Sequence, residues 1–167
     1  MSDVKATGIV FIGGKVSLRS AQMLQLSSGA LMPRIQLTDK EKAMLLGTAT
    51  QAMEHAYAPY SDFHVGAALV TEDGRLFTGC NVENASYGLT ICAERAAIFN
   101  AINQVQGKLK LRGIAVVNGR DVPCSPCGAC RQVIAEFGED TAVVFRGESG
   151  YVEMSIADLL PETFRFS

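Results

Sequence analysis

Three cysteines in this chain stand at spacings that suit a metal centre. Cys127 and Cys130 lie in the segment SPCGACRQV, at what reads as the start of a helix. The i, i+3 spacing places both sulfurs on one face of the first turn, where the helix dipole favours thiolates. Thiolates at this spacing suit zinc, and Cys92 in CAERAA, at another predicted helix start, could supply a third ligand. Three protein ligands leave the fourth position open, which is the arrangement of a catalytic zinc.

A carboxylate follows the first of these cysteines. Glu94 lies two residues after Cys92, and residues at i and i+2 of a helix do not face the same way. Glu94 is therefore an awkward ligand, although its side chain could reach a water molecule bound to the metal. The alternative is that Glu94 only stabilises the positive end of the helix.

Other functions of the cysteines remain open at this point. The chain has five cysteines, three of them within seven residues, which is a poor disulfide framework and more typical of metal binding or catalysis inside cells. The CxxC pair could be a structural zinc clip or a redox couple. Cys124 or Cys80 could be a fourth ligand, which would close the site, although Cys80 also suits a small core residue. We expect both histidines, His55 and His64, to be structural or exposed.

The hydrophobic pattern predicts nine elements. Thr38 and Glu41 form a capping box before a helix that Pro59 ends, and Asp73-Gly74 forms a hairpin turn. The order is α-β-β-α-β-α-β-β-α, which predicts a three-layer α/β/α fold with a five-stranded mixed sheet. The elements after the first helix are expected as strands at 63–71 and 75–83, a helix from 92, a strand at 113–118, a helix at 127–137, two strands within 141–155 and a short helix within 155–164.

Alternation along the second predicted strand places two polar side chains together. Asn81 and Glu83 fall on the same face, opposite Cys80. Side chains that point the same way can bind one ligand jointly. The alternative is that both are solvated residues at the end of a strand.

Composition restricts the remaining classes of function. Apolar residues make up 48% of the chain and charged residues 19%, and the formal net charge is −2. No basic run is present, so we expect no nucleic-acid partner, and no apolar stretch is long enough to span a membrane. Residues 1–36 are rich in Ser and Gly and poor in acids, which suggests a poorly ordered extension, a leader segment or a weak transit peptide. Met32 could be the start of the compact domain.

Four motifs in the same order give the chain a resemblance to a known family. PYSDFHVGAAL, GCNVENASY, CAER and SPCGACRQV resemble the zinc-dependent cytidine deaminases, from about Tyr57 to Phe164. The resemblance is to the small homotetrameric type with three cysteine ligands, since the related nucleobase and RNA-editing enzymes usually carry histidine where this chain has Cys92. It implies the cytidine deaminase-like fold, with a catalytic domain at 37–167.

The resemblance also implies a role for each matching residue. Cys92, Cys127 and Cys130 would bind one zinc ion per subunit, and Glu94 would move protons from the attacking water to the pyrimidine ring nitrogen and to the leaving ammonia. Asn81 and Glu83 would hold the ribose hydroxyls. Phe63 would pack against the pyrimidine ring, although it could instead be a core residue. The backbone near Ala85 and Cys92 and the loop near Tyr87 would contact the base. Phe164, or its rival Phe166, would reach into a neighbouring subunit's site.

Arg95 has a role that follows from charge. Zn²⁺ with three thiolates carries a formal charge of −1 and acidifies its water less than zinc with neutral ligands does. A guanidinium that donates hydrogen bonds to the thiolates would withdraw this excess charge. We therefore expect Arg95 to tune the metal without binding it.

The implied function is hydrolytic deamination of cytidine and deoxycytidine to uridine and deoxyuridine in pyrimidine salvage, by a cytoplasmic homotetramer with sites completed across subunits. A second possibility keeps the zinc chemistry but acts on a free base, a nucleotide, a nucleoside antibiotic or adenosine in RNA. The NVENASY segment favours a nucleoside over a free base, and the lack of a basic cluster argues against phosphates and RNA. A third possibility is a zinc-stapled binding module.

Overall fold

The computed structural model describes residues 36–166 of the chain, so the extension predicted at 1–36 lies, except for Gln36, outside the described residues. No helix within this range is long and apolar enough to cross a membrane. The elements are α1 (Asp39–Met53), β1 (Val65–Thr71), β2 (Leu76–Cys80), the 3₁₀ turn η1 (Tyr87–Leu89), α2 (Ala93–Gln104), β3 (Leu111–Asn118), α3 (Gly128–Glu136), β4 (Ala142–Gly147), β5 (Gly150–Ser155) and α4 (Ile156–Leu159).

The five strands form one mixed sheet in the order β2-β1-β3-β4-β5. β1 is antiparallel to both β2 and β3, β3 is parallel to β4, and β4 is antiparallel to β5. Helix α3 connects the two parallel strands, as a parallel pair requires a crossover. The predicted five-stranded mixed sheet is confirmed.

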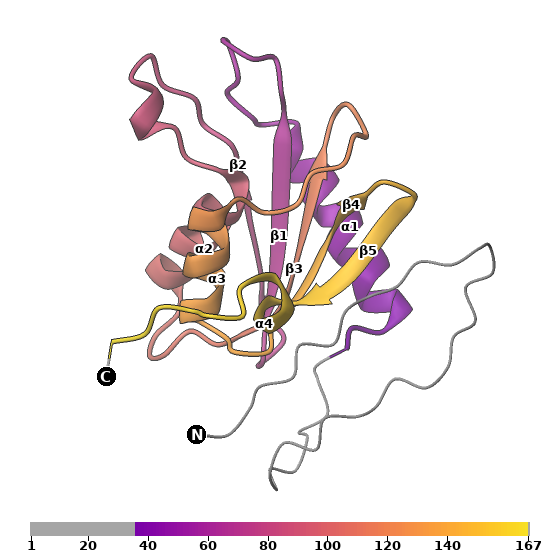
Figure 1. The fold of residues 1–167 in the computed structure, drawn as a ribbon, viewed down its shortest axis with the longest axis vertical. Coiled ribbons are helices and arrows are strands. Elements are labelled where there is room, and N and C mark those ends of the chain that lie inside the picture. Colours follow the sequence, from indigo (N-terminus) through magenta and orange to yellow (C-terminus); the bar gives the residue numbers. More distant parts are fainter. Residues whose placement is uncertain (1–35, 167) are drawn as a thin grey trace, which may run out of the picture. The chain divides into compact units, whose positions relative to one another are not determined.

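Helices cover both faces of the sheet (Figure 1). α1 packs on one face over a cluster that includes Leu45, Ala68 and Val144. α2, α3 and α4 pack on the other face over the larger cluster, which includes Ile98, Ile114 and Ile134. Burial of these apolar side chains on both faces is the main favourable term in the stability of such a sheet.

The start of α1 follows the predicted capping box, whereas its end does not follow the prediction. The Thr38 hydroxyl accepts a hydrogen bond from Glu41 N, and the Glu41 carboxylate accepts one from Thr38 N at 2.8 Å. The helix ends at Met53 rather than near Pro59, because the next hydrogen bonds tighten to i→i−3. Tyr57 N then donates to Asn81 O, which turns the chain toward β2.

Two glycines let the helices approach the sheet closely. A Cβ at Gly79 in β2 would lie 2.3 Å from Ala97 N, and one at Gly66 in β1 would lie 2.0 Å from Ala49 O. Real Cβ atoms essentially never come this close to backbone. The absence of a side chain at Gly79 therefore allows the short distance between the backbone of α2 and β2.

One end of the sheet gathers the connections that carry the candidate site. Val65 at the start of β1 pairs with Asn118 at the end of β3, and Cys80 at the end of β2 pairs with Gly66. The α1–β1, β2–α2 and β3–α3 connections therefore leave the sheet at the same end, as Figure 1 shows. Motifs that lie far apart in the sequence, such as PYSDFHVGAAL and SPCGACRQV, meet there.

Candidate active site

The three cysteines predicted as ligands come together at two helix starts. Cys92 is the N-cap of α2 and Cys127 is the N-cap of α3, while Cys130 lies in the first turn of α3. Their three Sγ atoms all lie within 4.8 Å of one another. Cys130 is buried and Cys127 is exposed, so the cluster has one side toward the core and one side toward solvent.

The geometry of this group fits a zinc ion. Zinc–sulfur bonds of about 2.3 Å in a tetrahedron place the sulfurs roughly 3.8 Å apart. The Sγ atoms of Cys92 and Cys127 are 3.9 Å apart. Within residues 36–166, this is the one group of His, Cys, Asp or Glu side chains close enough to hold a metal, and it includes neither Cys124 nor Cys80. The fourth position is therefore open.

Neighbouring donors favour the ionised form of one thiol. Hydrogen bonding from Cys130, opposed by burial and assisted by Arg95, lowers the pKa of Cys92 to about 5. The hydrogen bond between Cys130 and Cys92, together with burial, raises the pKa of Cys130 well above its ordinary value. This shift favours the thiolate form of Cys92, which is the form that binds metal.

Glu94 lies beside this cluster in the first turn of α2 and is 4% exposed. Burial raises its pKa, with a further contribution from the negative charge on Cys92. A carboxyl group with a raised pKa holds a proton more readily, as a group that both accepts and donates a proton must. Glu94 is not part of the sulfur cluster, in agreement with the prediction that it is not a ligand.

Two arginines contact the segments that carry the cysteines. Arg95 Nη2 lies 3.6 Å from the Cys92 sulfur and donates to Thr90 O at 3.3 Å. Arg131 Nε donates to Pro126 O at 2.8 Å, and its Nη1 donates to Leu159 O. Arg95 thus acts on a sulfur directly, whereas Arg131 fixes the loop before Cys127. Sequence reasoning missed Arg131, which shares the SPCGACRQV motif but carries no sign of its distant partner.

The predicted ribose pair holds the α1–β1 loop, and Val82 between the two residues bonds to Ile91, which precedes Cys92. The Asn81 amide accepts from Val65 N and donates to Phe63 O, both at 2.8 Å. The Glu83 carboxylate accepts from Tyr60 N at 2.8 Å and from the Ser61 hydroxyl. These bonds to Ser61 lower the pKa of Glu83. β2 ends at Cys80 rather than at residue 83, because the backbone that follows pairs with other segments: Glu83 N donates to Tyr57 O, and Val82 N donates to Ile91 O.

The aromatic residues expected around the base differ in burial. Phe63 is half-buried and packs against the larger core cluster, so it touches the core on one side. Ala85 is exposed, and Tyr87, which is 79% exposed, meets Tyr60 edge to face with ring centroids 6.4 Å apart.

The side chain of Cys80 is half-buried, with its sulfur 3.3 Å from His55 O. His55 is exposed and His64 is partly exposed.

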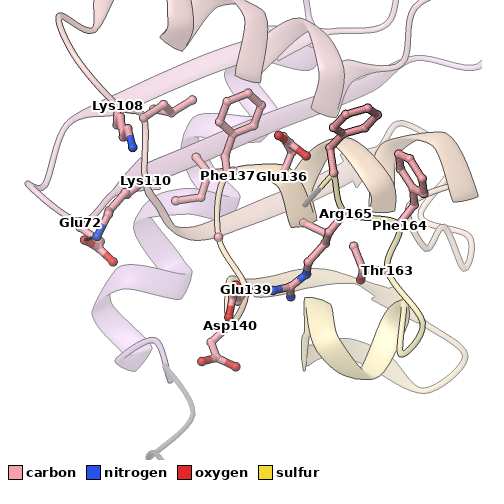
Figure 2. Close-up of a pocket in the computed structure, with 15 residues that line it drawn as sticks. Glu72, Lys108, Lys110, Glu136, Phe137, Glu139, Asp140, Thr163, Phe164 and Arg165 are labelled. Carbon is pink, nitrogen blue, oxygen red and sulfur yellow. Dashed lines mark hydrogen bonds and ion pairs between the residues drawn. The ribbon is translucent and has the colours of Figure 1, made fainter.

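The predicted C-terminal aromatics do not reach the cysteine cluster of their own chain. Phe164 is 70% exposed and Phe166 is 95% exposed. Both line a cavity of about 600 Å³ formed with residues 108–111 and the end of α3 (Figure 2). Gln132 donates to Phe164 O at 2.9 Å, and Arg165 forms an ion pair with Glu139. None of the other predicted site residues lines this cavity.

Comparison with protein families gives a match over most of the described residues. The profile described as the cytidine and deoxycytidylate deaminase zinc-binding region matches residues 38–146. A cytidine deaminase of Halalkalibacterium halodurans is 48% identical over 126 residues, which is 74% of this chain and 94% of that protein. A cytidine deaminase of Mycobacterium tuberculosis is 44% identical over 128 residues, covering 77% of this chain and 92% of that protein.

Solved structures agree with the sequence matches. The crystal structure of cytidine deaminase from Burkholderia pseudomallei is 48% identical with a TM-score of 0.67, covering 77% of this chain and all of that chain. That of cytidine deaminase from M. tuberculosis is 43% identical with a TM-score of 0.66, covering 75% of this chain and 98% of that chain.

Proposed function

The chain belongs to the cytidine and deoxycytidylate deaminase family, and on this basis we propose which of its residues carry the hydrolytic deamination of cytidine. The enzyme is a zinc-dependent hydrolase of the cytidine deaminase type. The reaction consumes water and replaces the amino group of the pyrimidine by oxygen, which gives uridine and ammonia, and deoxycytidine would react in the same way. The observation that supports the residue roles is a buried carboxyl, Glu94, beside three sulfurs at two helix starts.

Cys92, Cys127 and Cys130 are the residues that would hold the metal. When bound, a zinc ion acts as a Lewis acid that brings the pKa of a coordinated water toward neutrality. The chain's contribution would be to favour ionised sulfurs through two helix N-termini and to supply three ligands, one fewer than a closed tetrahedral site needs. Arg95, at 3.6 Å from the Cys92 sulfur, would withdraw part of the negative charge of three thiolates.

Glu94 would serve as the general base and then as the general acid. Its raised pKa lets the carboxylate take a proton from the attacking water and give it to the ring nitrogen of the base. The carboxylate would next take the second proton of the same water, as the new C–O bond becomes the carbonyl, and pass it to the amino group, which leaves as ammonia when its bond to the ring carbon breaks. Burial keeps this carboxyl away from bulk water, so each proton stays on the substrate side of the site.

Substrate binding would use the loops at the same end of the sheet. The carboxylate of Glu83 and the amide of Asn81 have acceptor and donor capacity beyond the bonds they make to the α1–β1 loop, and both would hold ribose hydroxyls. Phe63 would pack against the pyrimidine ring. The backbone at Ala85 and the loop near Tyr87 would contact the polar edge of the base.

We propose further that the active form is a homotetramer. Phe164 is 70% exposed in the single chain and lies away from its own cysteine cluster, which would allow it to enter a neighbouring copy's site. Phe99 and Ile102 of α2 are also more than two-fifths exposed and would be covered by a second copy. Light scattering on the full chain measures the mass, and Phe164→Ala compared with Phe166→Ala shows which aromatic affects KM.

The remaining proposals concern partners and location. The substrate is a small nucleoside, and we propose no nucleic-acid or membrane partner, since the chain carries a net charge of −2 without a basic run. Five free cysteines fit a reducing compartment such as the cytoplasm. We also propose that residues 37–167 form the catalytic domain, which a chain shortened to begin at Met32 would test by retaining turnover.

The test of this function is turnover with metal analysis on the full chain. Cytidine, deoxycytidine, cytosine and deoxycytidine monophosphate are compared by the loss of ultraviolet absorbance, before and after removal and return of zinc. We expect one zinc per chain, turnover of both nucleosides, and little or no turnover of the free base or the nucleotide. Zinc-independent turnover, or preference for cytosine or the nucleotide, would contradict the proposal.

A further inference from the structure

Arg120 connects two loops that are remote in the sequence. It lies in the β3–α3 connection, and its Nη2 donates to Ser61 O at 2.8 Å and to Asp62 O at 3.3 Å in the α1–β1 connection. Its guanidinium carbon lies over the Phe63 ring, 5.6 Å from the centroid. A cation at this distance from an aromatic face is attracted to it. One side chain therefore contacts three consecutive residues of the loop that ends in Phe63.

This loop has a backbone conformation that needs support. Asp62 has φ of 53°, in the left-handed region that a residue with a Cβ seldom occupies. Glu83 accepts hydrogen bonds from the N–H groups of Tyr60 and Ser61 on one side. Arg120 donates to the carbonyl groups of the same segment. The carboxylate thus takes the donors of the loop and the guanidinium takes its acceptors.

Arg120 is itself held by a fixed connection. Asn118 Oδ1 accepts from Arg120 N at 3.1 Å and from Val122 N at 3.2 Å. Arg146 in β4 pairs with the carboxylate of Asp121 at 2.8 Å, and Arg146 O accepts from Cys124 N. The same connection continues to Cys127. The position of Phe63 is thereby tied to the segment that carries two of the three sulfurs.

From these contacts we propose that Arg120 is a positioning residue that holds Phe63 against the pyrimidine ring of the substrate. The proposal rests on the proposed function, because it assigns the ring partner of Phe63. Arg120 donates to carbonyl groups and touches neither the cysteine cluster nor Glu94. It acts through the placement of Phe63, so it affects substrate binding and not the proton transfers at Glu94.

The first experiment compares steady-state kinetics of Arg120→Ala with those of a matched arginine variant. Arg120→Ala raises KM for cytidine and the inhibition constant of uridine by roughly tenfold, the size expected for loss of a charge-assisted contact, while kcat stays close to wild type. Arg120→Lys restores part of the effect, since lysine can donate to a carbonyl group. Arg75→Ala is the control, because it removes one positive charge and an ion pair to Asp73 in the β1–β2 turn. It leaves both constants unchanged.

The second experiment asks whether Arg120 acts through Phe63. Phe63→Leu alone raises KM, and addition of Arg120→Ala to it has little further effect, because the positioned ring is gone. Zinc content and melting temperature are measured for every variant, and uridine binding by calorimetry gives a readout without turnover. The proposal would be overturned if the increase in KM of the double variant equalled the product of the two single-variant increases. It would also be overturned if Arg120→Ala, like Arg75→Ala, left KM and the inhibition constant unchanged. A wild-type protein without cytidine turnover would instead refute the proposed function.

Discussion

Replacement of Gly79 by alanine tests how the fold places the site. The new Cβ would lie 2.3 Å from Ala97 N and 2.7 Å from Ala93 O, whereas ordinary contact begins at 3.4 Å. α2 would have to move outward by about 1.1 Å, because both neighbours are backbone atoms that cannot rotate away. Cys92 caps α2 and Glu94 lies in its first turn, so this motion would displace one sulfur and the proposed general base together.

The expected magnitudes follow from this displacement. Overpacking of a core typically costs about 1–3 kcal/mol in the free energy of unfolding, and contact with backbone places Gly79→Ala near the upper end. The gain from removing a strand glycine is at most about 1 kcal/mol and does not offset it. A misplacement of roughly 1 Å at catalytic groups can lower turnover by about 10²-fold. Gly79→Ala should therefore lose both stability and kcat.

The assay pairs this variant with a glycine that has free space. Apart from its chain neighbours and the backbone of its own helix, no atom lies within 4 Å of a Cβ at Gly47, which lies inside α1. Gly47→Ala should keep full turnover and gain up to about 1 kcal/mol, since alanine favours helix over glycine. Urea unfolding, zinc content and cytidine turnover are measured for both proteins. A Gly79→Ala protein with wild-type stability and turnover would refute the close-packing argument.

Three further predictions concern charge and ligand number. Arg95→Ala should keep its zinc and lose kcat, with partial recovery in Arg95→Lys; full zinc with unchanged kcat would contradict the charge argument. Cys124→Ser should keep zinc content, turnover and three metal-bound sulfurs by X-ray absorption, because Cys124 lies outside the cluster, and loss of a sulfur would contradict this. A hydrogen bond from the Thr38 backbone lowers the pKa of Glu41 from its ordinary value of 4.5. The ionised carboxylate of Glu41 therefore stabilises the fold above pH 4.5, and this stabilisation is lost as the pH falls through the lowered pKa of the folded state. The difference in unfolding free energy between wild type and Glu41→Gln should therefore be constant near neutrality and vanish in acid, and a difference that persists in strong acid would contradict the assignment.

The sequence predicted the parts of the fold whose signals are local. The Thr38 capping box, the Asp73-Gly74 turn and both cysteine-bearing helix starts depend on residues a few positions apart, and the structure has them where they were expected. The end of α1 was predicted too late. After Met53 the hydrogen bonds tighten to i→i−3, and Tyr57 then bonds to Asn81 and Glu83, a distant pairing that local periodicity does not contain.

Around the candidate site, too, the features set by neighbouring residues were predicted, whereas those set by distant contacts were not. CAER and SPCGACRQV bring their cysteines together because each motif opens a helix at the same end of the sheet. The distant contacts of Arg120 and Arg131 gave no signal, since the partners Asp62 and Leu159 are 58 and 28 residues away and contribute backbone carbonyl groups that any residue type could supply. Gly79 was expected only on a strand face, and its closeness to α2 required the packed structure.

The central claim is that Glu94 moves protons beside a zinc ion held by three cysteines. Glu94→Gln keeps the size of the side chain and removes its ability to accept and release a proton. The decisive measurement is cytidine turnover by zinc-loaded Glu94→Gln at matched zinc content, with uridine binding as the control for an intact site. We predict full zinc, retained uridine binding and turnover lower by about 10²–10⁴-fold or more, the range for loss of a general acid and base. Turnover close to wild type in the zinc-loaded variant would contradict the account.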